Sequence, residues 1–308
     1  MADPEAGIPF RKGHGTENDF VLLPDPDGAL ELTPARVRAL CDRRRGLGAD
    51  GVLRVVRTAA LAQPPGAPEA EWFMDYRNAD GSVAEMCGNG VRVFARYLAD
   101  AGLVGEDELV VGTRGGPRPV RFGADGEISV AMGAVRLGGT STATLAQRDP
   151  HRSESSQQQS ALGAPPASEA RTQQRFVGLV VDVGNPHLAC VTEVPLDGLD
   201  LCAAPGYDPD VFPSGVNIEL VTPVSGGEAR MRVYERGVGE TRSCGTGTVA
   251  AAAAALRHDG RTSGTLTVRV PGGRVRVELA EGSATLTGPA VLVAAGEIDP
   301  EWWRSLTT

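Results

Sequence analysis

Residues 85–90 read Glu-Met-Cys-Gly-Asn-Gly, and residues 242–247 read Arg-Ser-Cys-Gly-Thr-Gly. Each segment places a cysteine before a Gly-x-Gly that opens an alanine-bearing helical pattern, so one motif occurs twice in the chain. A thiol at a helix N-terminus lies among unpaired backbone N–H groups at the positive end of the helix dipole. That position favours the thiolate and provides an anion site beside it. Cys87 and Cys244 are therefore predicted to act as two bases around one anion.

The chemistry that most needs two bases around one anion is racemisation or epimerisation, in which a proton leaves one face of a carbon and returns to the other. An amino acid's α-proton is weakly acidic, so its removal without a cofactor requires a desolvated base and stabilisation of charge on the carboxylate. Backbone amides of Gly88 and Asn89, together with those of Gly245 and Thr246, are predicted to bind that carboxylate. A redox disulfide between the two thiols is the competing interpretation.

Composition limits the possible classes of protein. The chain has 308 residues, which suffices for two domains of ordinary size, and the two cysteine motifs fall in different halves. A net charge of −9 gives no electrostatic footprint for nucleic acid. No apolar run reaches the length of a membrane span, and residues 1–5 lack the features of a signal peptide. We therefore expect a cytoplasmic protein that binds neither nucleic acid nor membrane.

The five cysteines are odd in number and have no CxxC or Cys/His ligand spacing. Neither a disulfide framework nor a zinc site is suggested, so reduced thiols and no metal or other cofactor are expected. Cys41, Cys190 and Cys202 lack a glycine-rich helix start and are interpreted as small buried side chains.

Periodicity predicts two similar halves of the α/β (α+β) class. Behind Cys87, apolar residues recur at helical spacing from Val91 to Leu98, and behind Cys244 the segment 248–256 is nearly all alanine. Short strands bounded by Gly-rich turns surround each helix. Strands are expected at 51–56, 72–76, 109–112, 119–122, 127–132, 177–183, 231–234, 267–270, 275–279, 284–286 and 290–294.

We accordingly predict an N-terminal domain at 1–135, joined by a returning C-terminal strand at 292–308, and a C-terminal domain at 136–291. Residues 138–175 are poor in aliphatic side chains and rich in Ser, Gln, Ala and Pro. This low-complexity insert is interpreted as a disordered or mobile linker. An irregular surface loop of one domain is the alternative.

The ordered motifs of this chain resemble the diaminopimelate epimerase family over nearly its whole length. The resemblance implies a homodimeric epimerase, independent of PLP and metal, that converts LL-diaminopimelate to the meso isomer in lysine and peptidoglycan precursor biosynthesis. It also implies two pseudo-symmetric domains, each a mostly antiparallel curved sheet wrapped around a central helix. The motifs lie at 14–20, 46–51, 78–81 with 87–90, 184–187, 216–217, and 234–237 with 244–247.

Site residues follow from that resemblance position by position. Cys87 and Cys244 correspond to the catalytic pair, and Arg236 to a guanidinium that holds the distal carboxylate in a two-pronged contact. Glu235 corresponds to an acceptor for the substrate ammonium, and His187 to a supporting residue near the site. The substrate-binding set implied by the family is Asn18, Asn78, Gly88, Asn89, Asn185, Asn217, Glu235, Arg236, Gly245 and Thr246.

Three positions depart from the family pattern. Gly51 stands where many members have a glutamine, so one amide contact must be lost or replaced. The frequent Gly-Leu-Gly-Asn-Asp is Gly-Thr-Glu-Asn-Asp at residues 15–19. A C-terminal aromatic residue associated with the dimer contact in some members aligns with Ala294.

Three rival functions remain open on the sequence. A proline or hydroxyproline racemase typically carries a histidine where Asn89 stands and an Asp-Arg-Ser-Pro run before the second cysteine, and this chain has neither. An isomerase of the phenazine-biosynthesis type would lack the cysteine pair. A non-catalytic amino-acid binder would need the asparagines but not two thiols.

Overall fold

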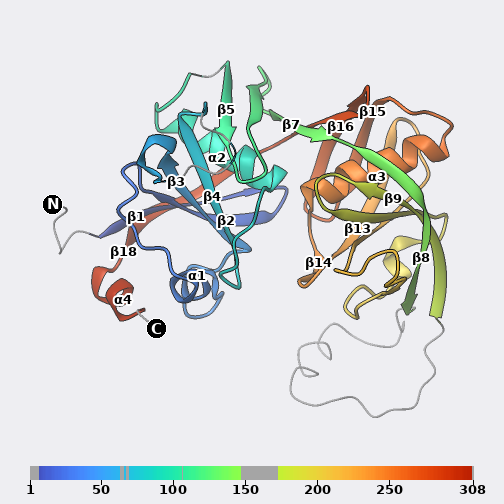
Figure 1. The fold of residues 1–308 in the computed structure, drawn as a ribbon, viewed down its shortest axis with the longest axis horizontal. Helices are drawn as coiled ribbons and strands as arrows, with labels where there is room; N and C mark the ends of the chain where they lie inside the picture. The colour runs from blue at the N-terminus through green and yellow to red at the C-terminus, as the bar shows by residue number, and fades with distance from the viewer. Residues whose placement is uncertain (1–6, 63–65, 67–68, 106, 147–172, 307–308) are drawn as a thin grey trace, which may run out of the picture.

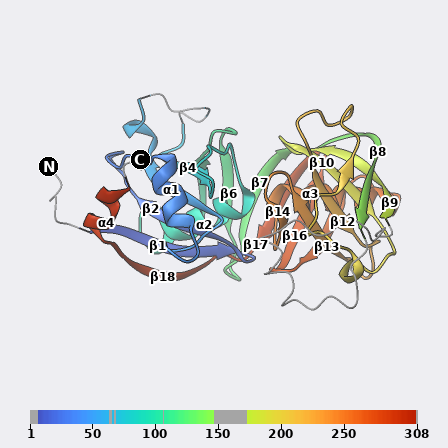
Figure 2. The ribbon, with the colours of Figure 1, turned by 90° about the horizontal axis from the view of Figure 1, so that it is seen from below.

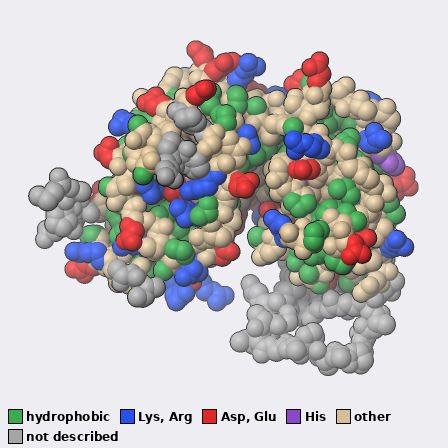
Figure 3. Space-filling model, in the orientation of Figure 1, with side chains coloured by type: hydrophobic (Ala, Val, Ile, Leu, Met, Phe, Trp, Pro, Cys, Tyr) green, Lys and Arg blue, Asp and Glu red, His purple; other side chains and the backbone are tan. Residues whose placement is uncertain are grey.

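The computed structural model describes residues 7–62, 66, 69–105, 107–146 and 173–306. The chain forms two lobes side by side, each with a helix inside a curved sheet (Figure 1). The space-filling view shows the surface hollowed between the lobes (Figure 3). Within the described ranges, no helix is both long enough and apolar enough to cross a membrane. The helix inside a curved sheet in each lobe confirms the predicted α/β (α+β) fold class.

The N-terminal lobe begins with a β-hairpin and continues through pairs of antiparallel strands that flank helix α2. The outer face of this lobe also carries α1 and the short C-terminal helix α4, whose Val37 and Trp303 share one apolar cluster with Val21 of β2. Its elements are β1 (Ile8–Gly15), β2 (Asn18–Pro24), α1 (Pro34–Cys41), β3 (Gly51–Arg57), η1 (Thr58–Ala60), β4 (Trp72–Asn78), α2 (Gly88–Asp100), β5 (Glu108–Gly112), β6 (Arg118–Phe122), β7 (Ile128–Ala134), β18 (Val291–Ile298) and α4 (Pro300–Ser305).

The C-terminal lobe surrounds helix α3 in the same way. Its elements are β8 (Arg136–Ala146), β9 (Gln173–Asp182), β10 (Pro186–Val191), η4 (Leu196–Gly198), β11 (Gly206–Tyr207), β12 (Asn217–Val221), β13 (Glu228–Glu235), β14 (Gly239–Thr241), α3 (Gly245–His258), β15 (Gly264–Val270), β16 (Gly273–Ala280) and β17 (Ser283–Gly288).

Strand pairing shows that the two lobes repeat one topology. In the first lobe β2 pairs parallel with β3, β3 antiparallel with β4, and β4 parallel with β5 across the helix α2. In the second lobe β10 pairs parallel with β12, β12 antiparallel with β13, and β13 parallel with β15 across α3. Each series then continues through two antiparallel hairpins, so the internal repeat of the sequence is a repeat of the fold.

The lobes exchange strands at their boundary. The last strands of the two series, β7 and β17, pair antiparallel with each other. After β7 the chain crosses into the second lobe, where β8 pairs with β9, and after β17 it returns to the first lobe, where β18 pairs with β1. The predicted division at residue 135 falls between β7 and β8. In Figure 2, β1 and β18 lie together along one side of their lobe.

The predicted insert at 138–175 is shorter than the sequence suggested, and this expectation was wrong at both ends. Residues 136–146 form β8 and residues 173–182 form β9, which pair antiparallel from Thr140 to Ala146. Strand β8 is rich in Gly and Thr, and its pairing uses backbone groups that do not require large side chains. The remaining residues, 147–172, lie outside the described part of the chain.

Each helix is buried on nearly every side because a sheet curves around it. In α3 all residues from Gly245 to Leu256 are buried, and the run of alanines from 250 to 255 lets strands approach the helix from several directions. Helix α2 presents larger side chains, among them Phe94 and Leu98, which are fully buried. A bulky residue in α3 would therefore meet backbone or packed side chains in any direction.

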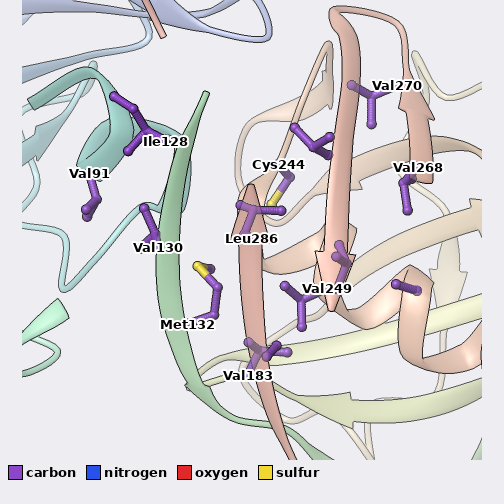
Figure 4. Packing of buried hydrophobic residues seen from close by; sticks show 14 of the residues in the cluster. Val91, Ile128, Val130, Met132, Val183, Cys244, Val249, Val268, Val270 and Leu286 are labelled. Atoms are coloured by element: carbon purple, nitrogen blue, oxygen red, sulfur yellow. The ribbon is translucent and has the colours of Figure 1, made fainter. Parts of the chain in front are cut away.

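One apolar cluster continues from lobe to lobe through the β7–β17 pair. Met132 on β7 and Leu286 on β17 lie between Val91 of α2 and the region of Cys244 and Val249 in the second lobe (Figure 4). A shared core and paired strands fix the position of one helix relative to the other.

Replacement of Ala252 by leucine tests this tight packing of α3. Ala252 is fully buried, so the added carbons must displace neighbours, and we expect a loss of about 1–3 kcal/mol in the free energy of unfolding. Urea denaturation measures it. Ala99→Leu, at a partly exposed site on α2, is the control and should change stability much less. Equal stability of both variants would contradict the packing argument.

Candidate active site

Cys87 and Cys244 occupy equivalent positions at the starts of the two central helices. Each is the N-cap residue, with an extended backbone, and its sulfur accepts a hydrogen bond from the backbone N–H three residues later. The Gly90 N to Cys87 Sγ distance is 3.5 Å, and the Gly247 N to Cys244 Sγ distance is 3.4 Å. The repeated sequence motif is therefore a repeated N-cap.

The two helix starts touch. A Cβ atom at Gly245 would lie 3.2 Å from the Cα of Gly88 and 3.3 Å from the backbone N of Asn89. On its other side Gly88 faces Met132, whose sulfur would lie 2.9 Å from a Cβ at residue 88. Only glycine permits this approach, which places unpaired N–H groups of both helices at one location. This location suits a small anion such as a carboxylate.

Burial opposes ionisation of both thiols. It raises the pKa of Cys87 to about 11, against the smaller lowering effect of the hydrogen bond from Gly90. Burial, and next the charge of Glu235, raise the pKa of Cys244 well above its ordinary value. The sequence-based expectation that the helix start favours thiolate thus describes only one of two opposing effects. Burial therefore favours the protonated form of both thiols.

Asn18 connects the β1–β2 hairpin to Cys87. Its Oδ1 accepts a hydrogen bond from Cys87 Sγ at 3.6 Å and another from Asn89 Nδ2 at 3.2 Å. Its Nδ2 donates to Asp50 Oδ2 at 2.8 Å. Thr16, at the hairpin tip, has a φ of 50° and Glu17 one of 62°, the left-handed conformation of a tight two-residue turn. The hairpin therefore holds Asn18 against the first thiol.

The same hairpin tip reaches the second lobe. Thr16 Oγ1 lies 2.7 Å from Ser243 Oγ, Asn89 Nδ2 donates to Ser243 Oγ at 3.1 Å, and Glu17 forms an ion pair with Arg242. Ser243 directly precedes Cys244, so polar contacts join the surroundings of the two cysteines across the lobe boundary.

A chain of polar contacts leads away from Cys244. Thr246 Oγ1 lies 3.6 Å from Cys244 Sγ and accepts from Asn185 Nδ2 at 3.4 Å. Asn185 Oδ1 lies 3.0 Å from His187 Nε2, and His187 Nδ1 lies 2.7 Å from Glu219 Oε1. His187 and Glu219 are fully buried, which fits the predicted supporting role of the histidine. Burial raises the pKa of Glu219, whereas the neighbouring His187 lowers it.

Three further predicted residues lie together at the end of β13. Asn217 Oδ1 accepts from the backbone N of Arg236 at 3.0 Å, and Asn217 Nδ2 donates to the Pro186 carbonyl oxygen at 3.0 Å. Arg236 is exposed, and its Nη1 donates to the Ser214 carbonyl oxygen at 2.9 Å. Glu235 accepts from the Thr241 hydroxyl, and burial raises the pKa of its carboxyl. The contact with Ser214 holds the Arg236 guanidinium at the surface of the second lobe.

Asn78 stands apart from the rest of the predicted set. It ends β4, and both its backbone N–H and its Nδ2 donate to Ser82 within the following turn, the latter to Oγ at 2.9 Å. Asn78 lies opposite Gly51 in the antiparallel β3–β4 pair. Within the described residues no hydrogen bond joins Asn78 to the cysteine segments.

Tyr76 explains the glycine at residue 51. A Cβ at Gly51 would lie 2.7 Å from Tyr76 Cε2 and 2.6 Å from the Arg77 carbonyl oxygen, so the ring occupies the space that a longer side chain would enter. Tyr76 is 9% exposed and packs edge-on against Phe20. Burial raises the pKa of its hydroxyl well above the ordinary value, and the charges of Cys87 and Glu235 add to that shift. A phenol thus lies close to both cysteine segments.

Sequence reasoning missed several residues that the structure brings into this network. Arg92 and Glu219 interrupt apolar runs, and a charged residue inside such a run is a sequence signal for a buried charge. The other members gave no signal of their own, because their roles depend on contacts between distant segments. The missed set is Thr16, Asp50, Tyr76, Arg92, Glu219 and Ser243.

Other parts of the described chain offer less chemistry. No group of three or more His, Cys, Asp or Glu side chains is placed to hold a metal ion among the described residues. A surface cavity of about 530 Å³ on the second lobe is lined by neither cysteine and is lined in part by Arg230, Arg232 and Arg269. These arginines form ion pairs with Asp197, Glu240 and Glu228 respectively. Their charges are thus neutralised within the protein.

Solved structures share this architecture. A PhzF-family phenazine biosynthesis protein from Bacillus anthracis matches with a TM-score of 0.62 at 17% identity, covering 95% of this chain and 99% of that one. A hydroxyproline epimerase from Agrobacterium vitis matches with a TM-score of 0.59 at 15% identity, covering 94% and 92%. These likenesses place the chain in the fold class that the phenazine biosynthesis protein and the hydroxyproline epimerase share.

Sequence comparison specifies the family within this class. The family model for diaminopimelate epimerase matches residues 10–138 and 179–293. The diaminopimelate epimerase of Rhodococcus opacus is 55% identical, covering 97% of this chain and 99% of the relative, and that of Mycolicibacterium smegmatis is 53% identical, covering 96% and 99%. This chain belongs to the diaminopimelate epimerase family.

The raised pKa of Cys87 predicts a measurable reactivity profile. Because only the thiolate is alkylated, the rate with iodoacetamide should rise about tenfold per pH unit and keep rising beyond pH 9, towards about 11. A small free thiol of ordinary pKa, about 8.5, should level off earlier and is the control. Peptide mass spectrometry of the reduced protein follows Cys87 alone. A plateau below pH 8 would show a resting thiolate.

Proposed function

We propose that this protein epimerises LL-diaminopimelate to meso-diaminopimelate, with Cys87 and Cys244 as the two proton-transferring groups and with no cofactor or metal ion. The observation that carries the proposal is the contact of two cysteine-capped helix starts through Gly88 and Gly245. This contact supports a site in which two thiols and the backbone N–H groups of two helix starts serve one substrate carboxylate. Family membership specifies the substrate.

The substrate carboxylate next to the reacting carbon would bind at the joined helix starts. Backbone N–H groups of the first helical turns, at Gly88, Asn89, Gly245 and Thr246, would donate to its oxygens, and both helix dipoles favour a negative charge there. As the α-proton leaves, charge moves onto these oxygens. Donors fixed in advance in a water-poor site stabilise that charge effectively.

Proton transfer then needs one thiolate and one thiol. One sulfur takes the α-proton and becomes a thiol, while the opposite thiol gives its proton to the other face of the carbon and becomes a thiolate. The carbon is inverted, no proton is gained or lost overall, and the two sulfurs have exchanged roles. Reverse turnover starts from that exchanged state, so neither base has to move across the substrate.

One thiol has to ionise for turnover, and burial, which raises both pKa values, opposes that step. Glu235 has a raised pKa, and its charge raises that of Cys244. It is thus a nearby group that can share a proton with Cys244. The approach of a substrate ammonium would favour the carboxylate form of Glu235, in line with its predicted contact to that group.

The far end of the substrate carries a second amino-acid head that must not react. Arg236 is exposed and held by Ser214, so its remaining N–H groups are available for a distal carboxylate. Asn18, Asn78, Asn185 and Asn217 supply amide donors and acceptors in the proposed binding set. Fixing the unreactive head presents only the other head to the thiols.

The biological setting belongs to the same proposal. The reaction would supply meso-diaminopimelate for lysine and peptidoglycan precursor synthesis in the cytoplasm. The net charge of −9 supports a protein that binds its small-molecule substrate and binds neither nucleic acid nor a membrane.

Single replacement of either cysteine by alanine should abolish epimerisation and leave the fold intact, because inversion needs one proton-transferring group on each face. Reduced protein is incubated with LL-diaminopimelate in D₂O, and proton NMR follows the α-proton and the meso isomer. The wild type should exchange the proton and form meso product. Cys87→Ala and Cys244→Ala should lower turnover by about 10³-fold or more.

L-Proline in a parallel tube separates this function from a proline racemase. Cys41→Ala, which alters a buried cysteine outside the site, controls for general effects of cysteine loss. Full turnover by both single site mutants would contradict the two-base mechanism. No exchange by the folded, reduced wild type with diaminopimelate would contradict the proposed substrate and favour an amino-acid binder.

A homodimer formed along β18 is part of the proposal. Val291 and Val293 are 43% and 56% exposed, and they lie on the strand that contains Ala294, at which the family's dimer-associated aromatic residue aligns. Among the described residues the strand pairs with β1 alone, so part of its apolar surface stays exposed there.

Replacement of Val293 by aspartate should shift the protein from dimer to monomer, because it puts a charge into that exposed apolar surface. Light scattering coupled to size-exclusion chromatography should give twice the mass of one chain for the wild type and one chain mass for the variant. Val177→Asp, at an equally exposed valine on β9 of the other lobe, should leave the dimer unchanged. A monomeric wild type would contradict the proposed dimer.

A further inference from the structure

Arg92 is a fully buried cation in the middle of the molecule. It follows Cys87 by five residues on α2 and is 0% exposed. Burial lowers its pKa to about 10, so the guanidinium keeps its charge at neutral pH. Within the described residues no carboxylate lies within ion-pair distance of it, and its buried Nη1 has no hydrogen-bond partner there. Such a charge is costly, and its partners therefore need an explanation.

The guanidinium contacts three different segments through neutral acceptors. Its Nη2 donates to Asn89 Oδ1 at 2.9 Å and to Thr16 Oγ1 at 3.4 Å. Its Nε donates to the Pro289 carbonyl oxygen, in the link between β17 and β18, at 3.3 Å. Gly15 leaves room for it, since a Cβ there would lie 3.0 Å from Nη2.

The first contact fixes the amide of Asn89. With Oδ1 bound to Arg92, the amide must direct its Nδ2 the other way, towards Asn18 Oδ1 at 3.2 Å and the Ser243 carbonyl oxygen at 3.3 Å. Asn18 Oδ1 is also the acceptor for the Cys87 thiol. A turned amide would place its oxygen against two other oxygens. The guanidinium therefore orients the amide of Asn89, which binds the same Asn18 oxygen that accepts from Cys87.

The second contact leads to the other cysteine. Thr16 Oγ1, which accepts from Arg92, lies 2.7 Å from Ser243 Oγ, and Ser243 also accepts from Asn89 Nδ2. Ser243 is 1% exposed and adjoins Cys244 in the chain. One guanidinium thus contacts two side chains that both bind the segment carrying the second thiol.

We propose that Arg92 is a positioning residue for the proposed epimerisation: its fork of N–H donors holds Asn89 and Thr16 so that Cys87 and Cys244 keep their mutual alignment. The inference rests on the proposed function. It assigns to Arg92 no contact with the substrate, and its action on Cys87 passes through Asn89 and Asn18. The cation also lies close enough to Cys87 to favour the thiolate electrostatically.

Two variants separate the effect of the paired N–H donors of Arg92 from the effect of its positive charge. Arg92→Lys keeps a cation but offers a single donor point, and Arg92→Gln removes the charge. We expect kcat to fall at least about tenfold in Arg92→Lys and about hundredfold in Arg92→Gln, with KM changed less than about threefold. Arg96→Lys and Arg96→Gln are the matched controls, because Arg96 lies one turn later on α2 and donates to the Gly126 carbonyl oxygen. Both controls should keep wild-type kcat.

A substrate-independent measurement accompanies the kinetics. The alkylation rate of Cys87 by iodoacetamide at pH 9, measured on the free protein, should fall at least about threefold in Arg92→Gln and less in Arg92→Lys, because loss of the cation disfavours the thiolate. This readout does not require turnover. Failure of the wild type to epimerise would therefore count against the proposed function and not against the role of Arg92.

Thermal unfolding shows whether each variant is folded. A purely structural role would lower the melting temperature while the folded fraction kept the wild-type kcat and alkylation profile, and that result would overturn the proposal. Wild-type kcat in Arg92→Lys would overturn it as well, since lysine cannot hold both acceptors in the same geometry. If Arg92→Gln does not fold, the kcat of Arg92→Lys decides the question.

Discussion

The contact between the starts of α2 and α3 is the constraint on which the rest of the structure depends. Gly88 and Gly245 bring two positive dipole ends together, an arrangement that is unfavourable until an anion lies between them. The curved sheets bury each helix on nearly every side, and the β7–β17 pair joins those sheets beside the contact. An anion such as a carboxylate would therefore be stabilised at the point where both cysteines are N-caps.

The same closeness opposes ionisation of the cysteines. Exclusion of water raises both pKa values, and the donors at the helix starts offset only part of that effect. In the proposed mechanism, the charges of the bound substrate would change this electrostatic balance. Neighbouring groups then matter: Glu235 lies beside one thiol, and Asn18, held by Asn89, beside the other. Reactivity is a property of the occupied site.

Much of this could be predicted from the sequence, because the duplicated Cys-Gly-x-Gly is local and helix starts follow from local rules. The α/β class, both central helices and the cysteine pair follow from it. The bounds of β8 could not be predicted, since a Gly- and Thr-rich strand pairs through its backbone. The exclusion of a side chain at Gly51 by Tyr76 depends on strand register. The partners of Arg92 lie on segments far away in the chain.

The strands that cross between the lobes limit how far the two cysteine segments can move relative to each other. Because β8 leaves the first lobe for the second and β18 returns, the lobes are joined by two covalent crossings and by the paired strands β7 and β17. The lobes cannot separate at the helix starts without breaking hydrogen bonds in that pair. Polar contacts at the hairpin tip, from Thr16 to Ser243 and from Glu17 to Arg242, add a second connection away from the sheet. These connections hold the two helix starts, each capped by a cysteine, against each other.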